Sequence, residues 1–148
     1  MKQLLYLEDL QIGQIFVSDS YTITTDEIQS FARQFDPQPF HLDTELATQS
    51  FFKRLVASGW HTASITMRLM VTSIPIAGGL IGAGVDALRW HCPVVPGDSL
   101  SVTSEIVSLR GSQKQNNQGL VRFKHTLFNQ QELTVLSFIS TTVVPKSP

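Results

Sequence analysis

The chain has 148 residues, of which 42% are hydrophobic and 16% charged, and a formal net charge of −1. This composition is typical of one globular domain and argues against a disordered chain. The near-neutral charge also argues against a protein that binds nucleic acid or a membrane surface, because such proteins carry a basic face. No apolar stretch reaches about 18 residues, so no membrane-spanning helix is expected.

Two features of the chain predict its location in the cell. The apolar run that follows Met1 and Lys2 meets an acid at Glu8 and is too short for a signal peptide. Cys92 is the only cysteine, which excludes an intrachain disulfide and suits a reducing compartment. We therefore expect a single cytoplasmic domain over residues 1–148.

After a short strand or extended arm, the first half of the chain is predicted to be helical. Thr24 and Glu27 match a capping box, and the apolar spacing that follows predicts a helix that Pro37 ends. Asp43 is placed to cap a second, short helix that continues towards Phe51.

The longest helix is predicted to begin at Ser58 and Gly59 and to end before Pro75. It is the natural centre of the fold, because about 15 helical residues span roughly 22 Å. The apolar stripe that recurs at helical spacing along it consists of Trp60, Ala63, Met67, Met70, Val71 and Ile74.

The second half of the chain alternates in hydrophobicity, as strands do. The alternating runs are residues 85–90, 100–107, 120–128 and 133–138. They predict an antiparallel meander of four strands, with a solvated hairpin loop at residues 112–119. Helices followed by strands indicate an α+β protein, in which a curved antiparallel sheet wraps around the long helix.

Asp36 and His41 are the strongest candidates for chemistry. They flank a segment that Pro37 and Pro39 stiffen, so two side chains suited to proton transfer are held on a rigid connection. An alternative is a turn in which Asp36 caps a backbone group and His41 is a partly buried polar residue. Spacing alone leaves both interpretations open.

Ser58 and Gly59 form a second candidate site. The first turn of a helix carries unpaired N–H groups and the positive end of the helix dipole. A carbonyl oxygen that gains negative charge could be stabilised there, and Gly59 would allow its close approach. Ser58 is equally well explained as an ordinary helix cap, and the two interpretations are compatible.

Other candidate sites fail in detail. The glycine-rich residues 76–84 run from helix to strand and lack the third glycine or lysine of a phosphate-binding loop, so we expect a flexible loop that shapes or covers a pocket. The four histidines are not spaced as metal ligands, and no metal site is expected. Cys92, which precedes Pro93, is expected to be a small buried residue of a strand.

Three motifs in order resemble the MaoC-like, or (R)-specific enoyl-CoA hydratase, family. They are residues 35–43, which are similar to its Asp-x-Asn-Pro-x-His signature, residues 56–63, which resemble its turn into the central helix, and residues 89–100, which resemble its Arg-x-x-x-Pro-Val-x-x-Gly-Asp strand and turn. The resemblance covers roughly residues 8–144. It implies a hotdog fold, a homodimer or higher oligomer, and reversible addition of water to a trans-2-enoyl thioester.

The resemblance also implies roles for individual residues. Asp36 would accept a proton from the water, His41 would orient that water and deliver a proton to Cα, and the Gly59 N–H would stabilise the enolate oxygen. Two residues depart from the family pattern. Gln38 replaces an asparagine, which puts the substrate preference in doubt, and Ser58 replaces a histidine while the backbone donor at Gly59 is kept.

The expected partner is an acyl-CoA or similar thioester, which serves as substrate, and no other cofactor is expected. Lys53, Arg54 and Arg89 are candidate partners of the CoA phosphates, although isolated basic residues are usually solvated surface. Two other functions remain open. A hotdog thioesterase could use the same helix end with an acid that activates water, and a non-catalytic acyl-binding protein could keep the fold without turnover.

Overall fold

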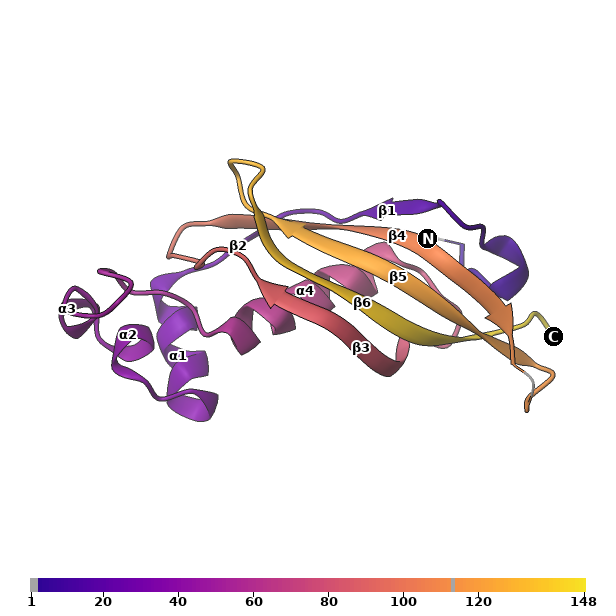
Figure 1. Cartoon of the computed structure of the whole chain (residues 1–148), viewed down its shortest axis with the longest axis horizontal. Coiled ribbons are helices and arrows are strands. Elements are labelled where there is room, and N and C mark those ends of the chain that lie inside the picture. The colour runs from indigo at the N-terminus through magenta and orange to yellow at the C-terminus, as the bar shows by residue number, and fades with distance from the viewer. Residues whose placement is uncertain (1–2, 113) are drawn as a thin grey trace.

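The computed structural model describes residues 3–112 and 114–148 (Figure 1). Met1 and Lys2, which begin the N-terminal run, and Gln113, in the predicted hairpin loop, lie outside the described residues. No helix in the described part is both long and apolar enough to cross a membrane. The elements are η1 (Leu7–Asp9), β1 (Ile15–Val17), β2 (Tyr21–Thr22), α1 (Thr25–Phe35), α2 (Pro39–Leu42), α3 (Thr44–Ala47), α4 (Gly59–Ser73), β3 (Ile81–Trp90), β4 (Ser99–Gly111), β5 (Gln118–Phe128) and β6 (Thr134–Pro145).

The strands build one antiparallel sheet in the order β1-β4-β5-β6-β3, and β2 also pairs with β4. The predicted meander of four consecutive strands is wrong in one respect, because β3 pairs with β6 and not with β4. Pro93 and Pro96 lie in the segment that follows β3. The His91 N–H in this segment still bonds to Val135 of β6, and the Gly97 N–H bonds to the Ile23 carbonyl, so the segment leads away from β3 and across to β4 and does not fold back as a hairpin. The result is that β3 is an edge strand.

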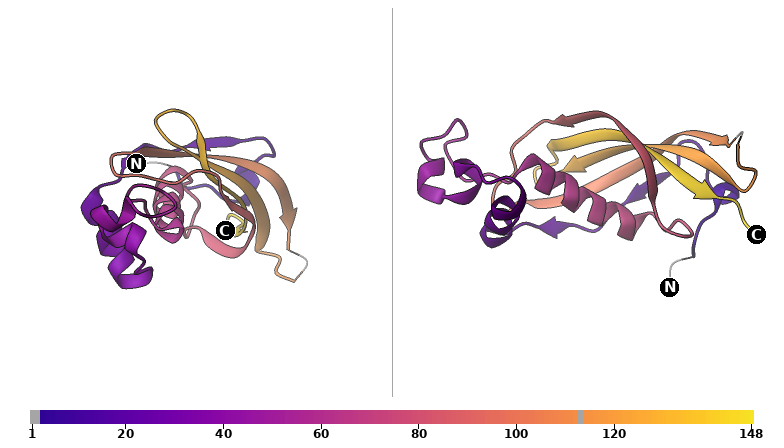
Figure 2. Two further views of the ribbon diagram at one scale, coloured as in Figure 1. Left: turned by 60° about the vertical axis from the view of Figure 1, so that its left-hand side comes forward. Right: turned by 90° about the horizontal axis from the view of Figure 1, so that it is seen from below.

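The concave face of the sheet wraps around α4 (Figure 2). Ile65, Leu69 and Met70 of α4 are buried in one apolar core with Phe123 of β5, and Ile74 joins that core just beyond the helix. Each fully buried apolar side chain of this size contributes roughly 1.5–3 kcal/mol. The core therefore fixes α4 against the sheet and so fixes the position of its first turn.

The predicted apolar stripe of α4 mixes two faces of the helix. Trp60, Met67 and Val71 are 59%, 47% and 48% exposed, and are not in the core. Thr62 and Thr66 are buried in their place, and the Thr66 hydroxyl donates to the Thr62 carbonyl at 2.8 Å. The prediction was wrong because a bonded threonine can be buried while an apolar side chain can be left on the surface.

The three other α-helices, α1, α2 and α3, gather at one end of the molecule (Figure 1). The capping box of α1 is confirmed, since the Thr24 N–H donates to the Glu27 carboxylate at 2.8 Å and the Glu27 N–H donates back at 3.2 Å. Asp43 caps α3 as predicted, but the helix ends at Ala47 and does not continue to Phe51. Hydroxyl side chains that follow α3 bond to its last carbonyls and end it there.

The glycine-rich residues 76–84 are only partly a loop. Gly78 and Gly79 have φ angles of +80° and +93°, which side chains rarely adopt, and they make the turn after α4. Gly82 and Gly84 lie in β3 and pair with β6, so the expected flexible loop is shorter than predicted.

His125 lies at the centre of the buried face of the sheet. Its Nδ1 is 2.8 Å from the Ser104 hydroxyl and its Nε2 is 2.8 Å from the Ser140 hydroxyl. The side chain is fully buried, and burial lowers the pKa of its imidazole to about 4. His125 is therefore a neutral core residue at physiological pH.

The buried His125 makes the stability of the protein depend on pH. An unfolded histidine has a pKa of about 6.5, so between there and about 4 the unfolded chain binds a proton that the folded chain does not. As the pH decreases through this window, His125 alone should lower the free energy of unfolding by about 3 kcal/mol. Urea unfolding at several pH values measures this free energy. In His125→Gln it should change less with pH, whereas in the control His91→Gln it should change as in the wild type. Equal pH dependence in all three proteins would show that His125 is not the source.

Candidate active site

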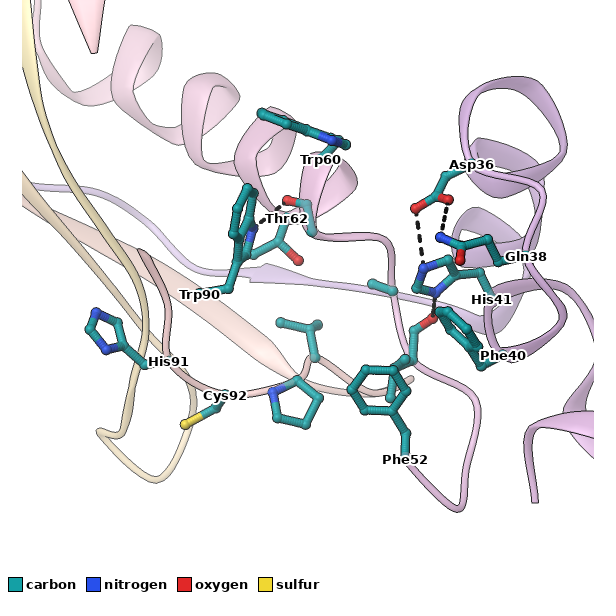
Figure 3. Close-up of a pocket in the computed structure, with 15 residues that line it drawn as sticks. Asp36, Gln38, Phe40, His41, Phe52, Trp60, Thr62, Trp90, His91 and Cys92 are labelled. Atoms are coloured by element: carbon teal, nitrogen blue, oxygen red, sulfur yellow. Dashed lines mark hydrogen bonds and ion pairs between the residues drawn. The ribbon is translucent and has the colours of Figure 1, made fainter. Parts of the chain in front are cut away.

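The structure brings Asp36 and His41 together. Asp36 is the residue at which α1 ends, and His41 lies in α2, a single turn that was not predicted and that begins at Pro39. The His41 Nε2 is 3.2 Å from the Asp36 Oδ2 (Figure 3). Proline suits the first position of a helix, because no N–H is needed there. The prolines thus end one helix and begin the next, which turns the two side chains towards each other.

Two contacts hold the ring of His41 in place. Its Nδ1 lies 2.6 Å from the Val56 carbonyl oxygen, which can only accept a hydrogen bond. Its Nε2 faces the Asp36 carboxylate, which when ionised also only accepts. The His41 ring is therefore held between the Val56 carbonyl and the Asp36 carboxylate, with its Nε2 directed at the carboxylate.

The carboxylate of Asp36 is held from both sides. The Gln38 amide donates to Oδ1 at 2.5 Å, while His41 contacts Oδ2. Burial acts to raise the pKa of Asp36, but the nearby Ser58 hydroxyl, the Gln38 amide and His41 outweigh it and hold the pKa below its ordinary value. Asp36 is therefore ionised at neutral pH, and its carboxylate contacts side chains and not the backbone cap that the alternative interpretation required.

Ser58 and Gly59 are at the start of α4, as predicted. Ser58 caps the helix, and its hydroxyl accepts the Trp60 N–H at 3.3 Å. The Gly59 N–H has no acceptor in the part of the chain that the structure describes. It is an unpaired donor at the positive end of a 15-residue helix. Such a donor can stabilise negative charge on a substrate oxygen.

Trp90 holds this first turn from the sheet. Its indole Nε1–H donates to the Gly59 carbonyl at 2.8 Å (Figure 3). A Cβ at position 59 would lie 2.7 Å from the same Nε1, a contact that real structures do not contain. A side chain at position 59 would therefore force either the indole or the first turn of α4 to move. Sequence analysis missed Trp90, although it lies in the third motif directly after Arg89.

One pocket of about 470 Å³ joins these groups. Asp36, His41 and Gly59 line it, and its remaining walls are mainly apolar. The apolar and aromatic lining includes Phe40, Phe52, Val56, Trp60, Trp90, Pro93 and Val94. An apolar pocket with a few convergent polar groups is the usual form of a small-molecule site.

Cys92 does not lie where it was predicted, and His61 and His91 make contacts with protein side chains. Cys92 lies just after β3 and not in it, is half-buried, and lines the pocket, so its predicted place in a strand was wrong. His61 stacks on Phe31 at 4.7 Å, and His91 bonds to the Ser137 hydroxyl at 2.7 Å. In the described residues, no three His, Cys, Asp or Glu side chains converge as metal ligands.

Comparison with known proteins gives one family for most of the chain. The MaoC like domain family matches residues 9–127. The chain is 31% identical over 130 residues to the uncharacterized protein YdeM of Bacillus subtilis (strain 168), with 87% of this chain and 91% of that protein covered. It is 29% identical over 110 residues to an (R)-specific enoyl-CoA hydratase of Rhodospirillum rubrum, with 74% of each covered.

A crystal structure gives the same result for the fold. The MaoC-like dehydratase from Rhodospirillum rubrum is 43% identical, superposes with a TM-score of 0.93, and matches 97% of this chain and 99% of its own. The predicted α+β hotdog fold, an antiparallel sheet around a long helix, is confirmed.

Proposed function

Because this chain belongs to the MaoC-like domain family, we propose that it adds water reversibly to trans-2-enoyl thioesters and yields (R)-3-hydroxyacyl thioesters. The family membership predicted from the three motifs is confirmed by the match over residues 9–127. The observation that carries the proposal is the ionised Asp36 at 3.2 Å from His41, whose ring is held by the Val56 carbonyl, in one pocket with an unpaired helix N–H. A relative named as an (R)-specific enoyl-CoA hydratase supports the same reaction.

Each of these groups has a role in the proposed reaction. A water in the pocket that contacts both Asp36 and His41 loses a proton to the Asp36 carboxylate as its oxygen bonds to C3 of the enoyl group. The electrons of the C2=C3 bond move onto the thioester oxygen, and the Gly59 N–H stabilises the enolate. His41 then gives its Nε2 proton to C2. Asp36 returns its proton to His41 across the 3.2 Å contact, which restores the pair.

A thioester panel tests the proposal. Purified protein should hydrate crotonyl-CoA or a longer trans-2-enoyl-CoA, seen as loss of the enoyl-thioester absorbance, and should leave saturated acyl-CoA intact. Release of free CoA from saturated acyl-CoA without hydration would instead identify a thioesterase. If the protein carries out neither reaction with any member of the panel, a non-catalytic acyl-binding protein would be favoured.

We further propose that two copies of the chain form a homodimer. The exposed apolar face of α4, which consists of Trp60, Met67 and Val71, leaves large side chains in contact with water. The adjacent edge strand β3 has one side unpaired, and Ile81 and Val85 on it are 56% and 58% exposed. Unpaired edges and apolar faces are the surfaces that protein association buries.

The variant Met67→Asp tests the dimer. A charge placed in an apolar interface and left without a partner costs several kcal/mol, so the mass in solution should fall from two chains to one. Size-exclusion chromatography with light scattering measures this mass. The control Leu133→Asp changes a side chain that is 50% exposed outside this surface, and should remain dimeric. A wild-type mass of one chain would contradict the proposal.

A further inference from the structure

The loop between α3 and α4 carries the most exposed large apolar side chain among the described residues. Phe51 is 91% exposed, and two cations, Lys53 and Arg54, follow it on the same exposed loop. A phenyl ring so exposed buries little of its apolar area within the chain. An aromatic ring beside two cations is the combination that binds a nucleotide, since the ring stacks on the base and the cations contact phosphates.

A row of aromatic rings connects this loop to the candidate active site. The ring of Phe40 lies 4.5 Å from that of His41, Phe52 lies 5.3 Å from Phe40, and Phe51 lies 5.4 Å from Phe52. Phe40 and Phe52 both line the pocket, and Figure 3 shows Phe52 at the side of it away from Trp60. The row therefore leads from the proposed reaction centre to the surface at Phe51.

The two cations are available for an anionic ligand. Among the described residues, no carboxylate lies within 4.0 Å of the Lys53 or Arg54 side chain, and the ion pairs present are Asp36–His41 and Asp86–Arg122. Lys53 also has a φ of +63°, a conformation that is unfavourable for lysine and that Gly or Asn adopts more readily. The Lys53 N–H bonds to the Ser50 carbonyl at 3.1 Å, which holds the turn in this form.

We infer that this loop binds the nucleotide end of a coenzyme A thioester, with Phe51 stacked on the adenine and Lys53 and Arg54 against the phosphates. This inference rests on the proposed function, because the thioester must reach the Asp36–His41 pair while its nucleotide lies outside. A thioester carried on a protein has the phosphate and the thiol arm but no purine ring. The exposed phenyl ring of Phe51 therefore favours CoA over a carrier protein.

Substrates with and without the nucleotide test the inference. In Phe51→Ala and in Arg54→Glu, the KM for crotonyl-CoA should rise about tenfold, because the first variant loses base stacking and the second loses a phosphate contact. The rise should be confined to the CoA thioester and be absent with crotonyl-N-acetylcysteamine, which lacks the nucleotide. Lys146→Glu makes the same change of charge near the C-terminus, at the opposite end of the molecule (Figure 1), and should leave both KM values unchanged.

Binding of free CoA, measured by calorimetry, separates this inference from the proposed function. If the wild type hydrates neither thioester but Phe51→Ala and Arg54→Glu weaken CoA binding about tenfold, the reaction is wrong and the nucleotide site stands. If the wild type hydrates crotonyl-CoA while both variants keep its KM, the nucleotide site is wrong. The nucleotide site would also be wrong if the KM rose equally with both thioesters, or if the variants lost activity only with a protein-carried thioester. A change of oligomeric state in Phe51→Ala would overturn it as well.

Discussion

Asp36→Asn and His41→Ala should each lower kcat for enoyl-CoA hydration by about 10²–10⁴-fold. The amide of Asn cannot take the proton of the attacking water, and without the imidazole no group at the 3.2 Å contact can protonate C2. Steady-state kinetics with crotonyl-CoA measures the loss, and circular dichroism with thermal unfolding verifies the fold.

The control for this prediction is Asp43→Asn. It removes the same charge from a nearby acid whose carboxylate caps α3, and asparagine caps helices equally well. Its kcat should stay within about twofold of the wild type, since surface changes of this kind have small effects. Full activity in either Asp36→Asn or His41→Ala would remove the pair from the mechanism.

Gly59→Ala should lower kcat by about 10²-fold or more, because the added methyl group disturbs the donor that stabilises the enolate. The Cβ would lie 2.7 Å from the Trp90 Nε1, so either the indole or the first turn of α4 must move. Activity with crotonyl-CoA is the measurement. Gly111→Ala is the matched control, because a Cβ there meets no atom within 4 Å and the activity should be unchanged.

A double variant tests whether Trp90 is the cause. Trp90→Leu removes both the indole that blocks the Cβ and the hydrogen bond to the Gly59 carbonyl, so alone it should lower kcat. The double variant Gly59→Ala/Trp90→Leu should have a kcat roughly tenfold above that of Gly59→Ala alone. This is the non-additivity expected for residues in contact. Simple addition of the two losses would show that Trp90 does not act through Gly59.

Local signals in the sequence were sufficient for most of the elements. The Thr24 capping box and Pro37 delimit α1, and Ser58 and Pro75 delimit α4, because each acts through neighbours within a few residues. The pairing of β3 with β6 could not be read in this way. Alternation marks a strand but carries no information on its partner, and residues 91–133 separate the two strands along the chain.

The same distinction explains what was found and missed at the site. Asp36, Gln38 and His41 lie within six residues of one another, so their stiff segment could be recognised directly. Trp90 bonds to Gly59 from 31 residues away, and only the packing of the sheet on α4 brings them together. The exposed face of α4 was assigned to the core because the helix has apolar residues on two faces, and a period of 3.6 cannot tell a core face from an interface.

The product formed from crotonyl-CoA in D₂O tests the central claim most directly. If Asp36 and His41 act on one water held on one face of the substrate, the hydroxyl at C3 and the deuterium at C2 should be added to the same face. The product should be the (R)-alcohol, with one deuterium at C2, and its formation should be lost in Asp36→Asn. Formation of the (S)-alcohol, addition to opposite faces, or no hydrated product from the wild type would contradict the account.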